Sequence, residues 1–154
     1  MLGQLSQNRV DIRPKLEAAT QDFCKAIGYP NGRFIIKGAL YRYDHIKEPK
    51  KEPVLLACER AGCYILANDA GQILYVGKGS RHMGNRIWDP FGRRGRDGEA
   101  DPFPDAKAWV KEDKPGVWAI CVPEEHWWLA MALEFFLIER VKNSGEPLKN
   151  KLLR

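Results

Sequence analysis

The sequence predicts an α+β fold, with a small antiparallel sheet that begins with a β-hairpin and is flanked by helices. Two short apolar segments, GCYILA at 62–67 and ILYVG at 73–77, are joined by NDAGQ, whose Asn, Asp and Gly favour a tight turn. Helical and strand patterns are mixed along the chain, without a repeated βαβ unit. The 154 residues are enough for one domain with its own hydrophobic core.

The remaining elements follow from hydrophobic spacing and turn residues. In RPKLEAATQDFCKAIG at 13–28, apolar residues recur at helical spacing up to a glycine. RFIIKGALYRY at 33–43 and GVWAICVP at 116–123 have the β-branched and aromatic content of strands. A helix is expected from about Ser80, and a short one in DAKAWVKE at 105–112. Proline and glycine predict loops at 45–53 and 89–104.

The strongest helical pattern is EEHWWLAMALEFFLIERVKNSG at 124–145. Two glutamates stand in its expected first turn, and Arg140 and Lys142 in its last, which suits the helix dipole at both ends. Glu134 lies within the apolar part of this helix, with Ala130 and Ile138 one turn away on either side. A carboxylate there is costly to bury without a partner. The partner is either an arginine in a structural salt bridge or a divalent cation, and we favour the cation.

Composition limits the class of protein. The net charge of +5 and the pI near 9.1 suggest an acidic partner, most commonly nucleic acid, although such a charge often serves only solubility. No apolar run approaches the roughly 20 residues that cross a bilayer, and residues 1–14 lack the apolar core of a signal peptide, so we expect a cytoplasmic protein. The four cysteines lack CxxC spacing, which favours buried free thiols over zinc ligands or disulfides.

The glycine-rich stretch ILYVGKGSRHMGNRI at 73–87 meets neither common nucleotide-binding motif. Five residues separate Gly71 from Gly77, where a P-loop needs four, and a hairpin stands where a P-loop has a parallel strand. The dinucleotide fingerprint GxGxxG also fails, because the glycine after Gly79 is Gly84.

A different ordered pattern fits the chain. Gly62-Cys63-Tyr64 and Tyr75-Val76-Gly77 occupy consecutive predicted strands, and Arg86, Glu134 and Asn150 follow in order. This set resembles the GIY-YIG nuclease family over residues 60–154, with Cys63 where the family usually has Ile. LEFFLI and PLKNKLLR are similar to the helix and closing segment of the family's excision-repair branch. Residues 1–59 form an N-terminal extension of unassigned role, and 89–104 a basic loop insertion.

The resemblance implies a role for each residue of the set. One of Tyr64 and Tyr75 would act as general base, directly or through water, while the other helps to hold the phosphate. Arg86 would stabilise the phosphate in the transition state, with Arg81 as a competitor for this role. Glu134 would bind one Mg²⁺ or Mn²⁺ ion. Gly62, Gly77 and Asn150 would orient the site.

Basic residues near these positions are candidates for nucleic-acid binding. Lys78 would supply positive charge beside the tyrosines, whose side chains otherwise titrate near pH 10. Arg93, Arg94 and Arg96, with Trp88 and Phe91, form a basic and aromatic loop that either grips phosphates and bases or is simply solvated.

The resemblance therefore predicts a divalent-metal-dependent endonuclease that cuts DNA, or RNA, to leave a 5′-phosphate and a 3′-hydroxyl. The alternative is a nucleic-acid-binding module on the same fold without cleavage activity. Cutting both strands symmetrically would require a dimer, for which residues 1–59 are one candidate interface.

Overall fold

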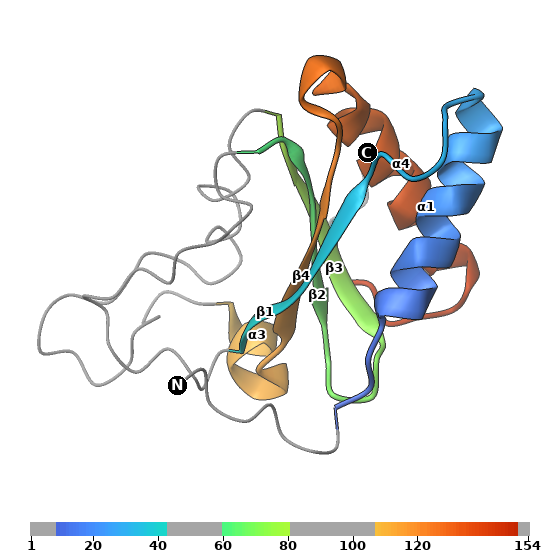
Figure 1. Cartoon of the computed structure of the whole chain (residues 1–154). Coiled ribbons are helices and arrows are strands. Elements are labelled where there is room, and N and C mark those ends of the chain that lie inside the picture. Colours follow the sequence, from blue (N-terminus) through green and yellow to red (C-terminus); the bar gives the residue numbers. More distant parts are fainter. Residues whose placement is uncertain (1–8, 43–59, 81–106, 151–154) are drawn as a thin grey trace, which may run out of the picture.

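The computed structural model describes residues 9–42, 60–80 and 107–150. Within them lies one antiparallel sheet of four strands with helices on both sides (Figure 1), which confirms the predicted α+β class. The elements in chain order are α1 (Arg13–Ile27), β1 (Ile35–Arg42), β2 (Gly62–Ala67), β3 (Ile73–Gly79), α3 (Ala108–Asp113), β4 (Gly116–Cys121), the 3₁₀ helix η2 (Glu124–His126) and α4 (Leu129–Asn143). The helix expected from Ser80 and the loops expected at 45–53 and 89–104 lie largely or wholly outside the described residues. No described helix has the length and apolar character that a membrane span needs.

The strand order is β1-β4-β2-β3, with antiparallel pairing throughout. The predicted hairpin is present as β2 and β3. Its turn is closed by hydrogen bonds from the Gly71 amide to the Asn68 carbonyl and from the Gln72 amide to the Asn68 side chain. Gly71 has a positive φ of 80°, a conformation that glycine adopts without steric cost.

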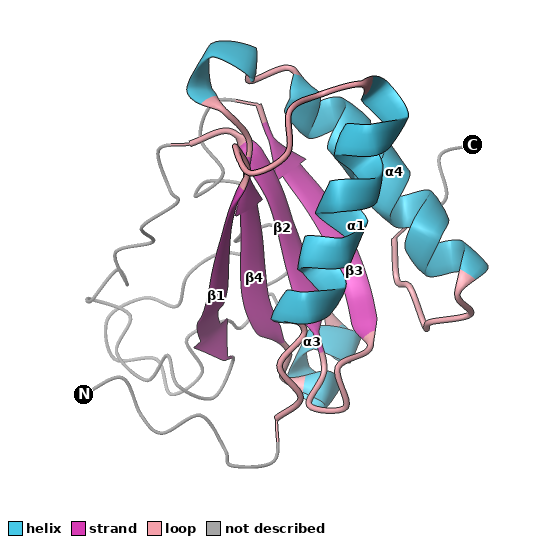
Figure 2. Cartoon of the chain, turned by 45° about the vertical axis from the view of Figure 1, so that its right-hand side comes forward, coloured by secondary structure: helices cyan, strands magenta, loops and turns pink. Residues whose placement is uncertain are grey.

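One face of the sheet carries the hydrophobic core, covered by α1 and α4 (Figure 2). Leu16 and Phe23 of α1 and Leu133 of α4 pack there against side chains that alternate along the strands, such as Ile65 and Val76. α1 ends at Gly28, whose backbone has the left-handed conformation that is common for a glycine after a helix. Three cysteines are described, and all three are buried free thiols, as the sequence predicted: Cys24, Cys63 and Cys121.

The described part of the N-terminal segment, residues 9–42, packs together with the described residues of 60–154. β1 pairs with β4, with Ile36 opposite Ile120, and the apolar face of α1 enters the same core as α4. The described part of the segment therefore completes the sheet and the core rather than forming a separate unit.

The expected helix at 124–145 is two elements, so the prediction of one continuous helix with glutamates in its first turn is wrong. Glu124 and Glu125 belong to η2, and α4 begins only at Leu129. His126 Nδ1 lies 2.5 Å from the Tyr29 hydroxyl, and the two rings are in edge contact. These contacts hold η2 against Tyr29, which follows α1 in the chain.

The free edge of β3 is covered by the segment 146–150. The Asn150 side chain accepts a hydrogen bond from the Val76 amide at 2.9 Å and donates one to the Val76 carbonyl at 2.7 Å. The Lys149 amide donates to the Leu74 carbonyl, and the Ile73 amide donates to the Glu146 carboxylate. The segment thus satisfies backbone groups that an edge strand would otherwise expose.

We predict that Asn150→Ala destabilises the protein by about 1–2 kcal/mol, because it removes both hydrogen bonds to the half-buried edge of β3. Urea denaturation measures this loss. Asn143→Ala, at an exposed position near the end of α4, is the matched control and should leave stability unchanged or slightly higher. Equal stability of the two variants would show that the Asn150 contacts contribute nothing.

Candidate functional site

Tyr64 and Tyr75 are in direct contact on the sheet face opposite α1 and α4. Their rings stack with centroids 5.9 Å apart and an interplanar angle of 23°. Tyr64 is buried, at 2% exposure, and Tyr75 is half-buried. The predicted proximity of the two tyrosines is therefore present in the structure.

A register shift in the hairpin puts both tyrosines on one face. Next to the turn, Ala67 pairs with Ile73, whereas farther along Leu66 pairs with Tyr75 and Tyr64 with Gly77. Leu74 is the extra residue on β3. Without it, the eleven-residue separation of the tyrosines would place them on opposite faces, because side chains alternate along a strand.

Gly77 leaves the space that the Tyr64 ring occupies. A Cβ atom at residue 77 would lie 2.1 Å from Tyr64 Cζ and 2.3 Å from its hydroxyl oxygen, far inside contact distance. Only glycine is compatible with this packing. Gly62 stands at the start of β2, opposite Gly79 at the end of β3, so the two strands carry no side chain at this end of their pairing.

The aromatic contact continues to α3, which the sequence analysis did not include in the site. Trp109 stacks on Tyr75 at a centroid distance of 6.0 Å, and Lys107 Nζ lies 5.9 Å from the centre of the Tyr75 ring. A stack of three aromatic rings with an adjacent cation results. The available signal was a tryptophan between two lysines in DAKAWVKE, which is weak because it also describes an ordinary surface helix.

Glu134 and Lys78 lie together on the other face, between β3 and α4. Burial raises the pKa of the half-buried Glu134 carboxyl, and the Lys78 charge lowers it in part. Cys63, opposite Lys78 in the hairpin, donates to the Ala130 carbonyl at 3.3 Å. Burial, and next the charge of Glu134, raise the pKa of the Cys63 thiol well above its usual value. This thiol is therefore protonated and unreactive at neutral pH.

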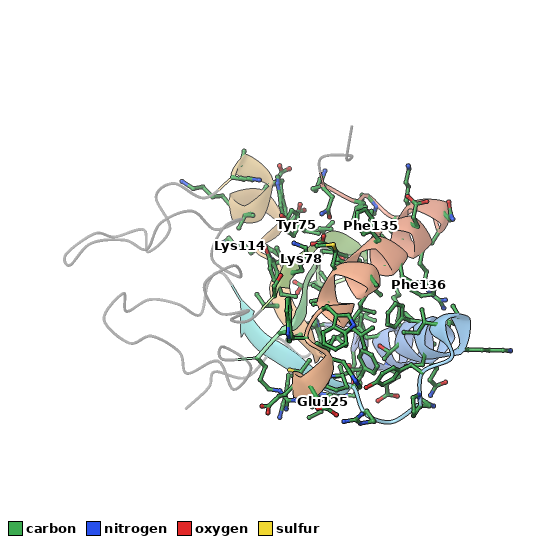
Figure 3. The ribbon with its side chains drawn as sticks, turned by 90° about the horizontal axis from the view of Figure 1, so that it is seen from above. Tyr75, Lys78, Lys114, Glu125, Phe135 and Phe136 are labelled. Atoms are coloured by element: carbon green, nitrogen blue, oxygen red, sulfur yellow. The ribbon has the colours of Figure 1, made fainter. Side chains whose placement is uncertain are left out.

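The tyrosine pair and the Glu134–Lys78 pair lie on opposite faces of the sheet, and each includes or contacts residues of β3. Gly77, under the Tyr64 ring, is followed directly by Lys78, beside Glu134. Figure 3 shows Tyr75 and Lys78 on this strand, between α3 and α4. Asn150 holds Val76, the residue between Tyr75 and Gly77. The structure thus brings the tyrosines together and Glu134 to Lys78, but places Glu134 and the tyrosine rings on opposite faces.

Among the described residues of the site, Glu134 is the one carboxylate that could bind Mg²⁺ or Mn²⁺. Among the described residues there is no group of three or more His, Cys, Asp or Glu suited to a metal. Mg²⁺ commonly binds through one or two carboxylates, with water and substrate phosphate as the other ligands. Glu134 is half-buried, and no ion pair of the described residues involves it, so the alternative of a structural salt bridge to an arginine is not found there.

Of the basic residues predicted for the site, Lys78 is among the described residues. The others lie outside the described residues: Arg81, Arg86, Arg93, Arg94 and Arg96.

Comparison with protein-family models, with curated proteins and with solved structures gives no significant match. The assignment to a class of protein therefore depends on the residue pattern and on the geometry above.

We predict that Gly77→Ala destabilises the protein by about 1–3 kcal/mol, because the added methyl group overlaps the Tyr64 ring. The measurement is urea denaturation in a double-mutant cycle with Tyr64→Ala. The cost of Gly77→Ala should largely disappear when Tyr64 is truncated. An equal cost in both backgrounds would mean that the Tyr64 ring does not set this requirement.

We predict that Glu134→Gln raises the Tm at pH 7, by about 1–3 °C. Because burial raises the pKa of Glu134, the folded state binds its proton more tightly than the unfolded chain does. The ionised carboxylate therefore costs stability once the pH exceeds the raised pKa, and this cost vanishes below the ordinary value of 4.5.

Thermal unfolding of both proteins at pH 7 and pH 4 tests this sign. The difference in Tm should shrink at pH 4, whereas Glu139→Gln, at an exposed position on α4, should leave Tm unchanged at both values. A lower Tm for Glu134→Gln at pH 7 would show that the carboxylate stabilises the fold.

Proposed function

We propose that the protein is a divalent-metal-dependent endonuclease with a GIY-YIG-type core, which hydrolyses DNA and leaves a 5′-phosphate and a 3′-hydroxyl. The observation that carries this proposal is that the motif residues gather on and around β3, although they do not share one face of the sheet. The tyrosines stack on one face, Lys78 and Glu134 adjoin on the other, and Asn150 holds the strand that links them. A DNA substrate agrees with the cytoplasmic location expected from the sequence.

The tyrosines are the candidates for accepting or relaying the proton of the attacking water. A free tyrosine titrates near pH 10, so this role at neutral pH requires nearby positive charge. Lys107 Nζ lies beside the Tyr75 ring, whereas Lys78 lies on the other face of the sheet, next to Glu134. Arg81 and Arg86 follow Lys78 in the sequence. Tyr75 is the more exposed of the pair and is the better candidate for contact with water.

Phosphate binding is assigned to Arg86 and Lys78, whose charges would stabilise the negative charge that develops in the transition state. Glu134 would hold one Mg²⁺ or Mn²⁺ ion, which when bound supplies Lewis-acid stabilisation of the leaving 3′ oxygen. The partial burial of Glu134 supports this role, because a carboxylate kept at a cost to stability is typical of functional sites.

We predict that Glu134→Ala and Arg86→Ala each lower cleavage roughly 100-fold or more, because they remove the metal ligand and a transition-state charge. The measurement is nicking of supercoiled plasmid and cutting of single-stranded oligonucleotides with Mg²⁺ or Mn²⁺. Glu139→Ala, five residues from Glu134 on the same helix, is the matched control and should cut like the wild type. Circular dichroism establishes that each variant is folded.

Metal-dependent cutting that survives both substitutions would contradict the assigned site. A wild type that binds nucleic acid but cuts no substrate would favour the second candidate, a binding module. The stack of Tyr64, Tyr75 and Trp109 with Lys107 specifically supports this second candidate, because base stacking beside a cation is a common way to hold single strands. In that case Trp109→Ala should weaken binding roughly 10-fold, with Trp127→Ala, at an exposed position in the turn before α4, as the control.

A further inference from the structure

The aromatic stack of the candidate site begins in the protein interior and ends on α3. Tyr64, at the inner end, is buried. Tyr75 is the middle ring, because Tyr64 stacks on it at 5.9 Å and Trp109 at 6.0 Å, with interplanar angles of 23° and 24°. Since Tyr64 is buried and Tyr75 already has two stacked neighbours, a further ring can join the stack at Trp109.

Trp109 is held in place by its neighbours in the chain. Val110, the next residue of α3, is fully buried, and β4 begins at Gly116, soon after α3 ends. Among the described residues, Tyr75 is the only one whose ring contacts the half-buried Trp109 indole. The stack therefore ends in a fixed and partly accessible indole, and aromatic rings in such positions pair with other flat rings.

The charges around Trp109 are mixed, so the rings identify the ligand better than the net charge does. Glu112 and Asp113 follow Trp109 at i+3 and i+4 on α3. Lys107 is exposed, its Nζ lies 5.9 Å from the centre of the Tyr75 ring, and it forms no ion pair with the described residues. A flat aromatic ligand with a negative group on the Lys107 side fits this place, and a nucleotide has this chemistry.

We propose that the Trp109 indole stacks on an unpaired base of the substrate, while Lys107 contacts the adjoining phosphate. Inside a duplex, neighbouring base pairs cover both faces of every internal base, so a base reaches this indole only after it leaves the stack. The substrate is therefore single-stranded DNA, or duplex DNA with an unpaired nucleotide beside the scissile bond. This inference rests on the proposed nuclease function for the bond that is cut, whereas the stacking itself requires no cleavage.

The first experiment measures binding by the full chain in EDTA, so that no cleavage occurs. A short single strand should bind roughly 10-fold more tightly than a duplex of the same sequence, and it should quench tryptophan fluorescence. Trp109→Phe keeps an aromatic ring, so it should bind the strand within about threefold of the wild type but lose most of the quenching. Trp109→Leu should lose both the quenching and the preference for the single strand. Trp128→Ala, at an exposed position, is the control and should keep both.

The second experiment compares cutting of one labelled strand with Mg²⁺ in three contexts: alone, in a perfect duplex, and in a duplex where one nucleotide is unpaired. The wild type should cut the first and third substrates roughly 10-fold faster than the perfect duplex. In Trp109→Leu this ratio should fall to about 1, because the stacked base is no longer held. Circular dichroism establishes that the variant is folded.

The outcomes separate this inference from the proposed function. A wild type that cuts the perfect duplex as fast as the single strand would overturn the inference and leave the nuclease proposal standing. Quenching that survives in Trp109→Phe would also overturn it, as would a Trp109→Leu variant that loses activity equally on all three substrates, since Trp109 would then only support the fold. Binding of single strands that depends on Trp109, without cutting of any substrate, would support the stacking and contradict the nuclease proposal.

Discussion

In the β2–β3 hairpin, one extra residue at Leu74 shifts the pairing between the turn and the far end of the strands, and the arrangement of the candidate site depends on this shift. It places Tyr64 and Tyr75 on the same face and leaves Cys63 and Lys78 facing α4. A slip of one residue would reverse the face of every side chain on β3. The segment 146–150 holds the shifted strand in place, because it bonds to the backbone of Ile73, Leu74 and Val76.

The site also shows a conflict between stability and chemistry. Glu134 lies next to the buried face of α4, where an apolar residue would pack at no electrostatic cost. Its pKa is raised because burial removes water from its charge. Lys78 offsets part of this cost from β3. Gly77 presents a similar case, since an interior strand position without a side chain loses packing but admits the Tyr64 ring. Sites that violate local rules in this way are often functional.

The sequence was sufficient for the fold class and most elements, because these depend on local signals. The signals are a turn with Asn, Asp and Gly between two apolar segments, and the regular helical spacing of apolar residues. Three features depended on contacts between distant residues and could not be read from it. The expected helix at 124–145 is divided into η2 and α4, and His126 of η2 contacts Tyr29. The pairing of β1 with β4 joins the N-terminal segment to the sheet. The stacking of Trp109 on Tyr75 was missed for the same reason. Within the site, the motif predicted the contact of the tyrosines but not the opposite placement of Glu134.

The chemistry of the cut ends tests the central claim most directly, because it reports which phosphodiester bond breaks. Oligonucleotides digested by the wild type with Mg²⁺ would be analysed by mass spectrometry and by polymerase extension of the products. The account predicts 5′-phosphates and 3′-hydroxyls that a polymerase extends without further treatment. Products that end in a 3′-phosphate or a cyclic phosphate would contradict it, since they require that the other P–O bond be broken.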